Sequence, residues 1–136
     1  VQGGNGTIGY ADASKAGDLG TAKIKVGDEY VGYSADAAAK AVEVSPKVEG
    51  RSENDIALEL ARDTKEAGSY PIVLVSYMVM CDTYEKKEDA DLVKAYASYV
   101  ISEQGQNDAA QAAGSAPLSA KLREDAQKSI DAIKAK

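Results

Sequence analysis

Short β-prone runs separated by glycine-rich turns make up the first quarter of the chain. Residues 1–10 are rich in glycine and end in Thr-Ile-Gly-Tyr, which predicts a tight turn followed by a short strand at 7–10. Residues 21–31 place Gly27 and Asp28 between two β-prone stretches. A Gly-X pair in this position predicts a β-hairpin with a type II′ turn.

The next segment changes from an extended to a helical pattern. Residues 34–43 are rich in alanine, begin with a serine and are followed by Pro46. Alanine is the best helix former, and the Ser34 hydroxyl can accept a free backbone N–H, so a short helix capped by Ser34 and stopped by Pro46 is expected.

Residues 54–64 fit two patterns equally well. Ile56 and Leu60 match a helical i, i+4 stripe, whereas Ile56, Leu58 and Leu60 alternate with Ala57 and Glu59 as in a strand. The residues themselves leave both alternatives open.

A nearly continuous apolar run covers residues 72–81 and is rich in β-branched side chains. This pattern predicts a strand that is covered on both faces. Cys81 ends the run, so we expect it to be a buried small hydrophobic residue rather than a nucleophile. The run is far shorter than the ~20 residues of a membrane-spanning helix.

Helical spacing dominates the last third of the chain. Residues 89–103 predict a helix that ends near Gly105. Its expected inward face is the stripe of Leu92, Tyr96, Tyr99 and Val100.

Two further helices are expected after it. Residues 107–113 predict a short helix that ends at Gly114, and Ala-Pro-Leu at 116–118 interrupts the pattern. Ser119 is then placed to cap a final helix. The apolar side of that helix consists of Leu122, Ala126, Ile130 and Ile133.

Composition indicates one mixed α/β domain and excludes several kinds of chemistry. The 136 residues contain 44% hydrophobic side chains but no Phe and no Trp, so small and β-branched residues must build the core. The absence of His excludes Ser-His-Asp hydrolysis, Cys-His proteolysis and histidine-built metal sites within this chain. A net charge of −6 argues against nucleic acid as a partner, since a phosphate backbone requires a basic face. No metal site, catalytic residue or cofactor is therefore predicted.

The stretch from Gly4 to Gly9 matches G-x-G-x-x-G, and Asp28 lies roughly where a ribose-binding acid would follow. A dinucleotide-binding loop must follow a strand and open a helix, and neither condition is met here. We favour glycines that shape a turn over an enzyme with a nucleotide loop.

Two acidic pairs, Asp89 with Asp91 and Glu124 with Asp125, have a similar structural explanation. Carboxylates are common in the first turn of a helix, where they complement the helix dipole, or on solvated faces.

Three stretches, in order, resemble the C-terminal half of the substrate-binding protein of the ABC-type phosphate transporter. Residues 5–12 (NGTIGYAD) resemble the G-x-I-G-Y strand of that family, and residues 70–77 (YPIVLVSY) resemble its Tyr/Trp-Pro-Ile segment. Residues 92–96, 102–106 and 113–118 resemble its helix, Gly-Gln turn and terminal Pro-Leu. The resemblance covers essentially the whole chain and rests on order and spacing.

The resemblance implies an α/β fold of the two-lobed periplasmic-binding-protein type II, of which this chain is a fragment that lacks its true N-terminus. Residues 1–69 would end the second, inserted lobe, and residues 70–136 would finish the first. Tyr70, Pro71 and Ile72 would form the hinge or crossover between the lobes. The comparison also favours a strand at 56–64 and implies that the strand at 72–81 has an unpaired edge, which self-association could cover.

The implied function is reversible phosphate capture without chemistry, in an extracytoplasmic receptor that delivers inorganic phosphate to ABC permease subunits. The phosphate ligands of the family do not carry over, because Arg51 and Ser52 are followed by Glu-Asn and not by Ser-Gly-Thr. Phosphate would then bind only together with the missing N-terminal half. The alternative from another class is a stand-alone structural or interaction domain without a small ligand.

Overall fold

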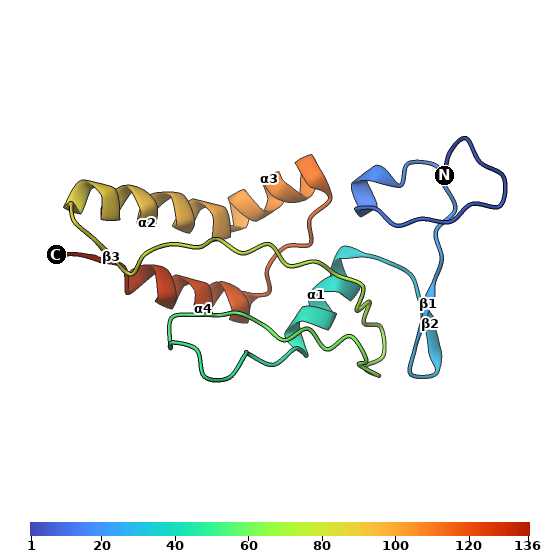
Figure 1. Ribbon diagram of the computed structural model, residues 1–136, viewed down its shortest axis with the longest axis horizontal. Coiled ribbons are helices and arrows are strands. Elements are labelled where there is room, and N and C mark those ends of the chain that lie inside the picture. Colours follow the sequence, from blue (N-terminus) through green and yellow to red (C-terminus); the bar gives the residue numbers. More distant parts are fainter.

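The computed structural model describes residues 1–136 as a mixture of helices and small sheets (Figure 1). The helices are the 3-10 turn η1 (Ala13–Lys15), α1 (Ala35–Glu43), α2 (Lys87–Ile101), α3 (Glu103–Ala113) and α4 (Ala120–Asp131). The strands are β1 (Ile24–Val26), β2 (Glu29–Val31), β3 (Thr83–Tyr84) and β4 (Lys134–Ala135). Figure 1 shows the N-terminal residues and the β1–β2 hairpin at one end of the long axis and the C-terminus at the other.

The predicted hairpin is confirmed. Strands β1 and β2 pair antiparallel with Val26 opposite Glu29, which leaves Gly27 and Asp28 as a two-residue loop. Gly27 has a φ of +58°, and no residue other than glycine has a positive φ, so Asp28 does not share this conformation. A positive φ at the first loop position alone is the signature of a type II′ turn.

The predicted first helix is also confirmed. Ser34 is in the extended conformation, and its hydroxyl accepts a hydrogen bond from the backbone N–H of Ala37 in α1. The helix ends at Glu43, three residues before Pro46. Ala37 and Ala41 form its buried face.

The core lies between α2 and α4. Ala97 and Ile101 of α2 pack with Ala126 and Ile130 of α4. The partly buried side chains around them are Ile56, Met80 and Leu118. Ser119 caps α4 by accepting from the N–H of Leu122, as the sequence predicts.

The predicted inward stripe of α2 is wrong. Leu92, Tyr96 and Tyr99 are exposed, and the buried face carries Ala90 and Ala97. The i, i+4 spacing of both stripes is helical, so spacing does not distinguish them. Small alanine side chains allow close approach of α4, whereas the Tyr side chains are amphipathic and tolerate water.

Gly105 does not end α2, which is a second correction. Ser102 separates the two helices: it follows α2, and its hydroxyl accepts from the N–H of Gly105 in the first turn of α3. A Cβ at Gly105 would lie 2.1 Å from the carbonyl oxygen of Tyr99. The glycine therefore permits the close turn between the helices rather than stopping one. The end of α3 at Gly114, in the left-handed conformation, is as predicted.

The strand predicted at 7–10 is absent. The glycine-rich turn before it is confirmed, with the N–H of Gly4 donating to the carbonyl of Val1. Ile8 and Tyr10 are exposed and have no strand partner. Without a neighbouring strand, β-prone residues gain neither ladder hydrogen bonds nor side-chain burial. No helix opens directly after the G-x-G-x-x-G stretch, since only η1 follows.

Residues 54–64 form neither a helix nor a regular strand. A single antiparallel bridge joins Leu58 to Lys47, and the backbone N–H of Glu59 donates to the carbonyl of Pro46. The strand favoured by the family comparison is therefore reduced to one bridge. Ile56 contacts the α2–α4 core, so this apolar side chain is partly buried without a regular element around it.

Residues 72–81 run as an extended segment that is paired with no strand (Figure 1). The prediction of a strand covered on both faces is wrong, because Leu74 is 86% and Val79 is 94% exposed. Cys81 is likewise exposed rather than buried. The family resemblance implied an unpaired sheet edge here, but the segment belongs to no sheet, so what the structure shows is an extended stretch without a strand partner. Burial of this run requires a neighbouring strand, and β1 to β4 pair only among themselves.

Candidate functional site

The predicted crossover residues connect the loop after Arg62 to the extended segment. The backbone N–H of Tyr70 donates to the carbonyl of Ala37 in α1 at 2.9 Å. Pro71 is buried, and Ile72 is exposed at the start of the apolar run. The stretch predicted as the crossover is thus anchored to a helix at its first residue and exposed to solvent at its last.

Arg62 also bonds to the stretch predicted as the crossover. One guanidinium N–H donates to the carbonyl of Pro71 at 2.9 Å, and another donates to the carbonyl of Val73 at 3.1 Å. A fork of fixed, always charged donors suits two carbonyls that point the same way. Nothing in the sequence pattern marks Arg62, because its partners are backbone atoms.

The loop before the crossover is fastened to α1. Lys40 donates to the carbonyl of Ala67 at 2.5 Å, and its Nζ lies 3.4 Å from a carboxylate oxygen of Glu66. Gly68 has a φ of +77°, and Ser69 is fully buried with a hydroxyl that has no partner within the protein. The path of the chain into Tyr70 is therefore fixed by contacts with α1.

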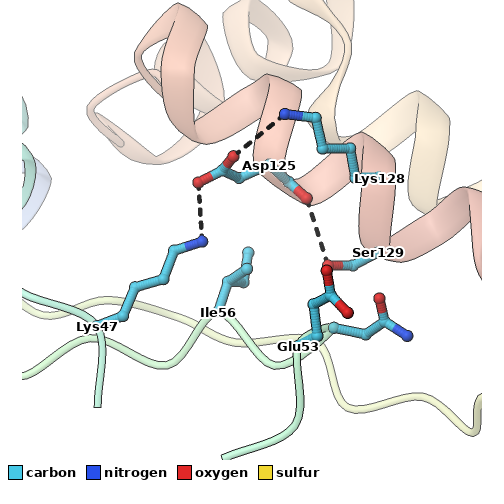
Figure 2. A pocket seen from close by; sticks show the side chains of 7 residues that line it. Lys47, Glu53, Ile56, Asp125, Lys128 and Ser129 are labelled. Atoms are coloured by element: carbon cyan, nitrogen blue, oxygen red, sulfur yellow. Dashed lines mark hydrogen bonds and ion pairs between the residues drawn. The ribbon is translucent and has the colours of Figure 1, made fainter. Parts of the chain in front are cut away.

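A polar pocket of about 210 Å³ lies between α4 and the loop that carries the Lys47–Leu58 bridge (Figure 2). Its lining consists of Lys47, Glu53, Asn54, Ile56, Asp125, Lys128 and Ser129. The Nζ of Lys47 lies 2.9 Å from Asp125, and Lys128 lies 2.9 Å from Glu124 and 3.7 Å from Asp125. Figure 2 shows Lys47 and Ile56 reaching from the loop toward α4.

The charges of this pocket neutralise one another. The hydrogen bond from Lys47 lowers the pKa of Asp125 below its usual value, and Lys128 adds to the effect. The hydrogen bond with Glu124 raises the pKa of Lys128. Both lysines are thus engaged by carboxylates, and the arrangement acts as a polar contact between loop and helix rather than as an anion site.

A second hollow, of about 550 Å³, lies at the turn of the hairpin. Its lining includes Gly27, Asp28 and Lys65. None of its lining residues comes from the G-x-G-x-x-G stretch. The structure contains no group of three or more His, Cys, Asp or Glu side chains that could hold a metal ion.

The acidic pairs have the structural roles that their positions suggest. Asp89 lies in the first turn of α2, and Asp91 pairs with Lys87 one helical turn before it. Glu124 pairs with Lys128 within α4. The sequence does not indicate the contact of Asp125, because its partner Lys47 lies in a loop that is distant along the chain.

Comparison with known families assigns the fold. A family model described as PBP superfamily domain matches residues 1–104. This chain belongs to the periplasmic-binding-protein (PBP) superfamily. The match confirms the α/β, PBP-type fold class and the resemblance to substrate-binding receptors. No curated protein and no solved structure matches the chain. Proteins of the PBP superfamily are typically extracytoplasmic, and none of the helices here has the length and apolar character needed to cross a bilayer.

Proposed function

We propose that this PBP-superfamily chain is part of an extracytoplasmic receptor that binds inorganic phosphate and delivers it to the permease subunits of an ABC importer. The observation that carries the proposal is the family match over residues 1–104. The ordered resemblance at residues 5–12, 70–77, 92–96, 102–106 and 113–118 supports it. The role is binding and release, with no catalytic step and no cofactor.

In this proposal residues 1–69 belong to the second lobe and residues 70–136 to the first. Tyr70, Pro71 and Ile72 form the hinge, and the anchoring of Tyr70 to Ala37 supports a defined crossover at this point. The two segments would then touch where Lys47 and Ile56 meet α4.

Phosphate selectivity in such a receptor comes from hydrogen-bond donors and one protonatable acceptor around a dehydrated anion. Sulfate has no proton to offer at neutral pH, so it would leave a buried acceptor unpaired. The chain has no Arg-x-x-x-Ser-Gly-Thr segment, and the lysines of the polar pocket are held by Asp125 and Glu124. The 136 residues by themselves are therefore expected to bind phosphate weakly or not at all.

Isothermal titration of phosphate, with sulfate as the control anion, tests the proposal. It compares this chain with the same chain joined to its native upstream sequence. Tight phosphate binding by the longer polypeptide alone is the expected result. Failure of both samples to bind would remove phosphate as the ligand, and tight binding by the 136 residues would contradict the assignment of the ligand groups to upstream residues.

An interaction domain without a small ligand is the second candidate, and a specific observation favours it. The extended segment 72–81 exposes Leu74 and Val79, carries no charged side chain and pairs with no strand. Unpaired, uncharged strand edges are templates for association. A chain that binds no anion but self-associates through this segment would fit this second candidate.

A further inference from the structure

We propose that Arg62 is the positioning residue of the crossover, and that its guanidinium sets the direction in which the extended segment 72–81 leaves Pro71. The contacts are a property of the chain itself. The consequence for ligand release rests on the receptor function proposed above.

The geometry of the Arg62 guanidinium, whose N–H groups bind two carbonyls, is the first argument for this role. Arg62 donates to the carbonyls of Pro71 and Val73, at 2.9 and 3.1 Å. In an extended chain, carbonyls two residues apart lie on the same edge, so one planar guanidinium can reach both. Two parallel bonds from a rigid donor fix the orientation of this short stretch, which a single bond would not.

The position of the fork carries the second step. Pro71 has no N–H, so this edge of the segment begins without a donor of its own, and no strand lies beside it. Arg62 supplies the donors that a neighbouring strand would otherwise supply. Its side chain joins the loop before the crossover to the start of the segment after it, and further along the segment the Tyr77 hydroxyl accepts from the N–H of Leu58.

The anchoring of Tyr70 carries the third step. Its N–H is bonded to Ala37 of α1, while Arg62 holds the two following carbonyls. Residues 62–73 therefore form a closed unit, attached to α1 through Tyr70. Lys40 of α1 holds the same unit through its bond to Ala67. A rotation of the extended segment relative to α1 must therefore break either the Arg62 bonds or the bonds of this unit to α1.

The first experiment uses the 136-residue chain and three variants: R62A, R62K and the matched control R51A. Arg51 is also exposed, and its bond to Asp55 lies outside the crossover. In R62A the carbonyl ¹³C resonances of Pro71 and Val73 should move upfield, and the Tyr70 amide should exchange about tenfold faster. R62K, a point charge without the fork, should restore one carbonyl resonance at most. R51A should leave all three signals unchanged.

Each outcome supports or overturns the proposed role of the Arg62 bonds to Pro71 and Val73. Unchanged carbonyl resonances and Tyr70 exchange in R62A would overturn it. Full restoration of both resonances by R62K would show that charge suffices and would overturn the role of the fork. If R62A does not fold, the carbonyl resonances of R62K test the proposal instead. A Lys side chain that keeps both resonances at their wild-type positions would contradict the need for the guanidinium fork.

The second experiment measures phosphate association and dissociation rates in the polypeptide that includes the native upstream sequence. R62A is expected to dissociate phosphate about tenfold faster, with R62K in between and R51A unchanged. If the unmodified polypeptide binds no phosphate, the proposed function fails while the carbonyl resonances still decide the Arg62 contact. If it binds and R62A releases phosphate at the normal rate, the positioning role is overturned although the function stands.

Discussion

The Nζ of Lys47 lies 2.9 Å from the Oδ2 of Asp125, and this ion pair joins a loop of the first half of the chain to α4 in the second. Ile56 reaches the α2–α4 core from the same loop. A polar and an apolar contact thus hold the loop on the helix side by side, although the two ions are 78 positions apart in the sequence.

This pair should make stability depend on acidity. The Lys47 bond lowers the pKa of Asp125 from its usual 3.8. A carboxyl whose folded pKa is depressed contributes stability that is complete above the unfolded pKa and is lost as pH falls through the folded pKa. The free energy of unfolding of the wild type, measured in urea, should therefore fall more steeply below about pH 4 than that of D125N.

A matched pair of lysine variants checks the cause. K47M should reduce the loss of unfolding free energy below about pH 4, as D125N does, because it removes the main cause of the lowered Asp125 pKa. K15M, in the exposed turn η1, should follow the wild type. An equally steep loss of unfolding free energy at low pH in the wild type, D125N and K47M would show that the Lys47–Asp125 pair is not its cause.

Gly105 should not tolerate a side chain. Alanine is the better helix former by about 1 kcal/mol, but its Cβ would lie 2.1 Å from the Tyr99 carbonyl oxygen. G105A is therefore expected to lower the free energy of unfolding by about 1–3 kcal/mol. Gly20 has no atom within 4 Å of a built Cβ, so G20A is the control in the same urea titration. An unchanged or raised midpoint for G105A would show that the α2–α3 turn can relax.

The two faces of α2 should differ sharply in energy. Ile101 is 5% exposed in the core, whereas Leu92 is 69% exposed. I101A should cost about 2–5 kcal/mol of unfolding free energy by leaving a cavity, and L92A about 0.5 kcal/mol or less. Chemical denaturation of both variants measures this difference. A larger loss of unfolding free energy in L92A than in I101A would support the inward-facing Leu92 stripe that the spacing predicts.

The extended segment 72–81 should make the isolated chain self-associate. A charge at its most exposed positions opposes strand pairing, so L74K is expected to shift the chain toward monomer in sedimentation equilibrium. I8K adds the same charge at an equally exposed site outside the segment, so it should leave association unchanged. A wild type that stays monomeric over the whole concentration range, or an I8K effect as large as that of L74K, would argue against association through this edge.

Local signals along the chain were sufficient for the elements that depend on neighbouring residues. The Gly27-Asp28 turn, the Ser34 and Ser119 caps and the end of α3 at Gly114 follow from φ preferences and from hydroxyl bonds within three residues. Because these interactions close within one turn, they need no tertiary partner.

Tertiary structure decided which surfaces are buried. Spacing alone does not tell the Leu92 stripe from the Ala97 face, and the apolar run at 72–81 is exposed because no strand lies beside it. The Lys47–Asp125 pair and the Arg62 fork join residues that the sequence pattern does not connect, and the fork binds backbone carbonyls that every residue has. The sequence by itself determined the local turns, the caps and the family, whereas burial and the anchoring of residues 70–73 arose only when distant segments met.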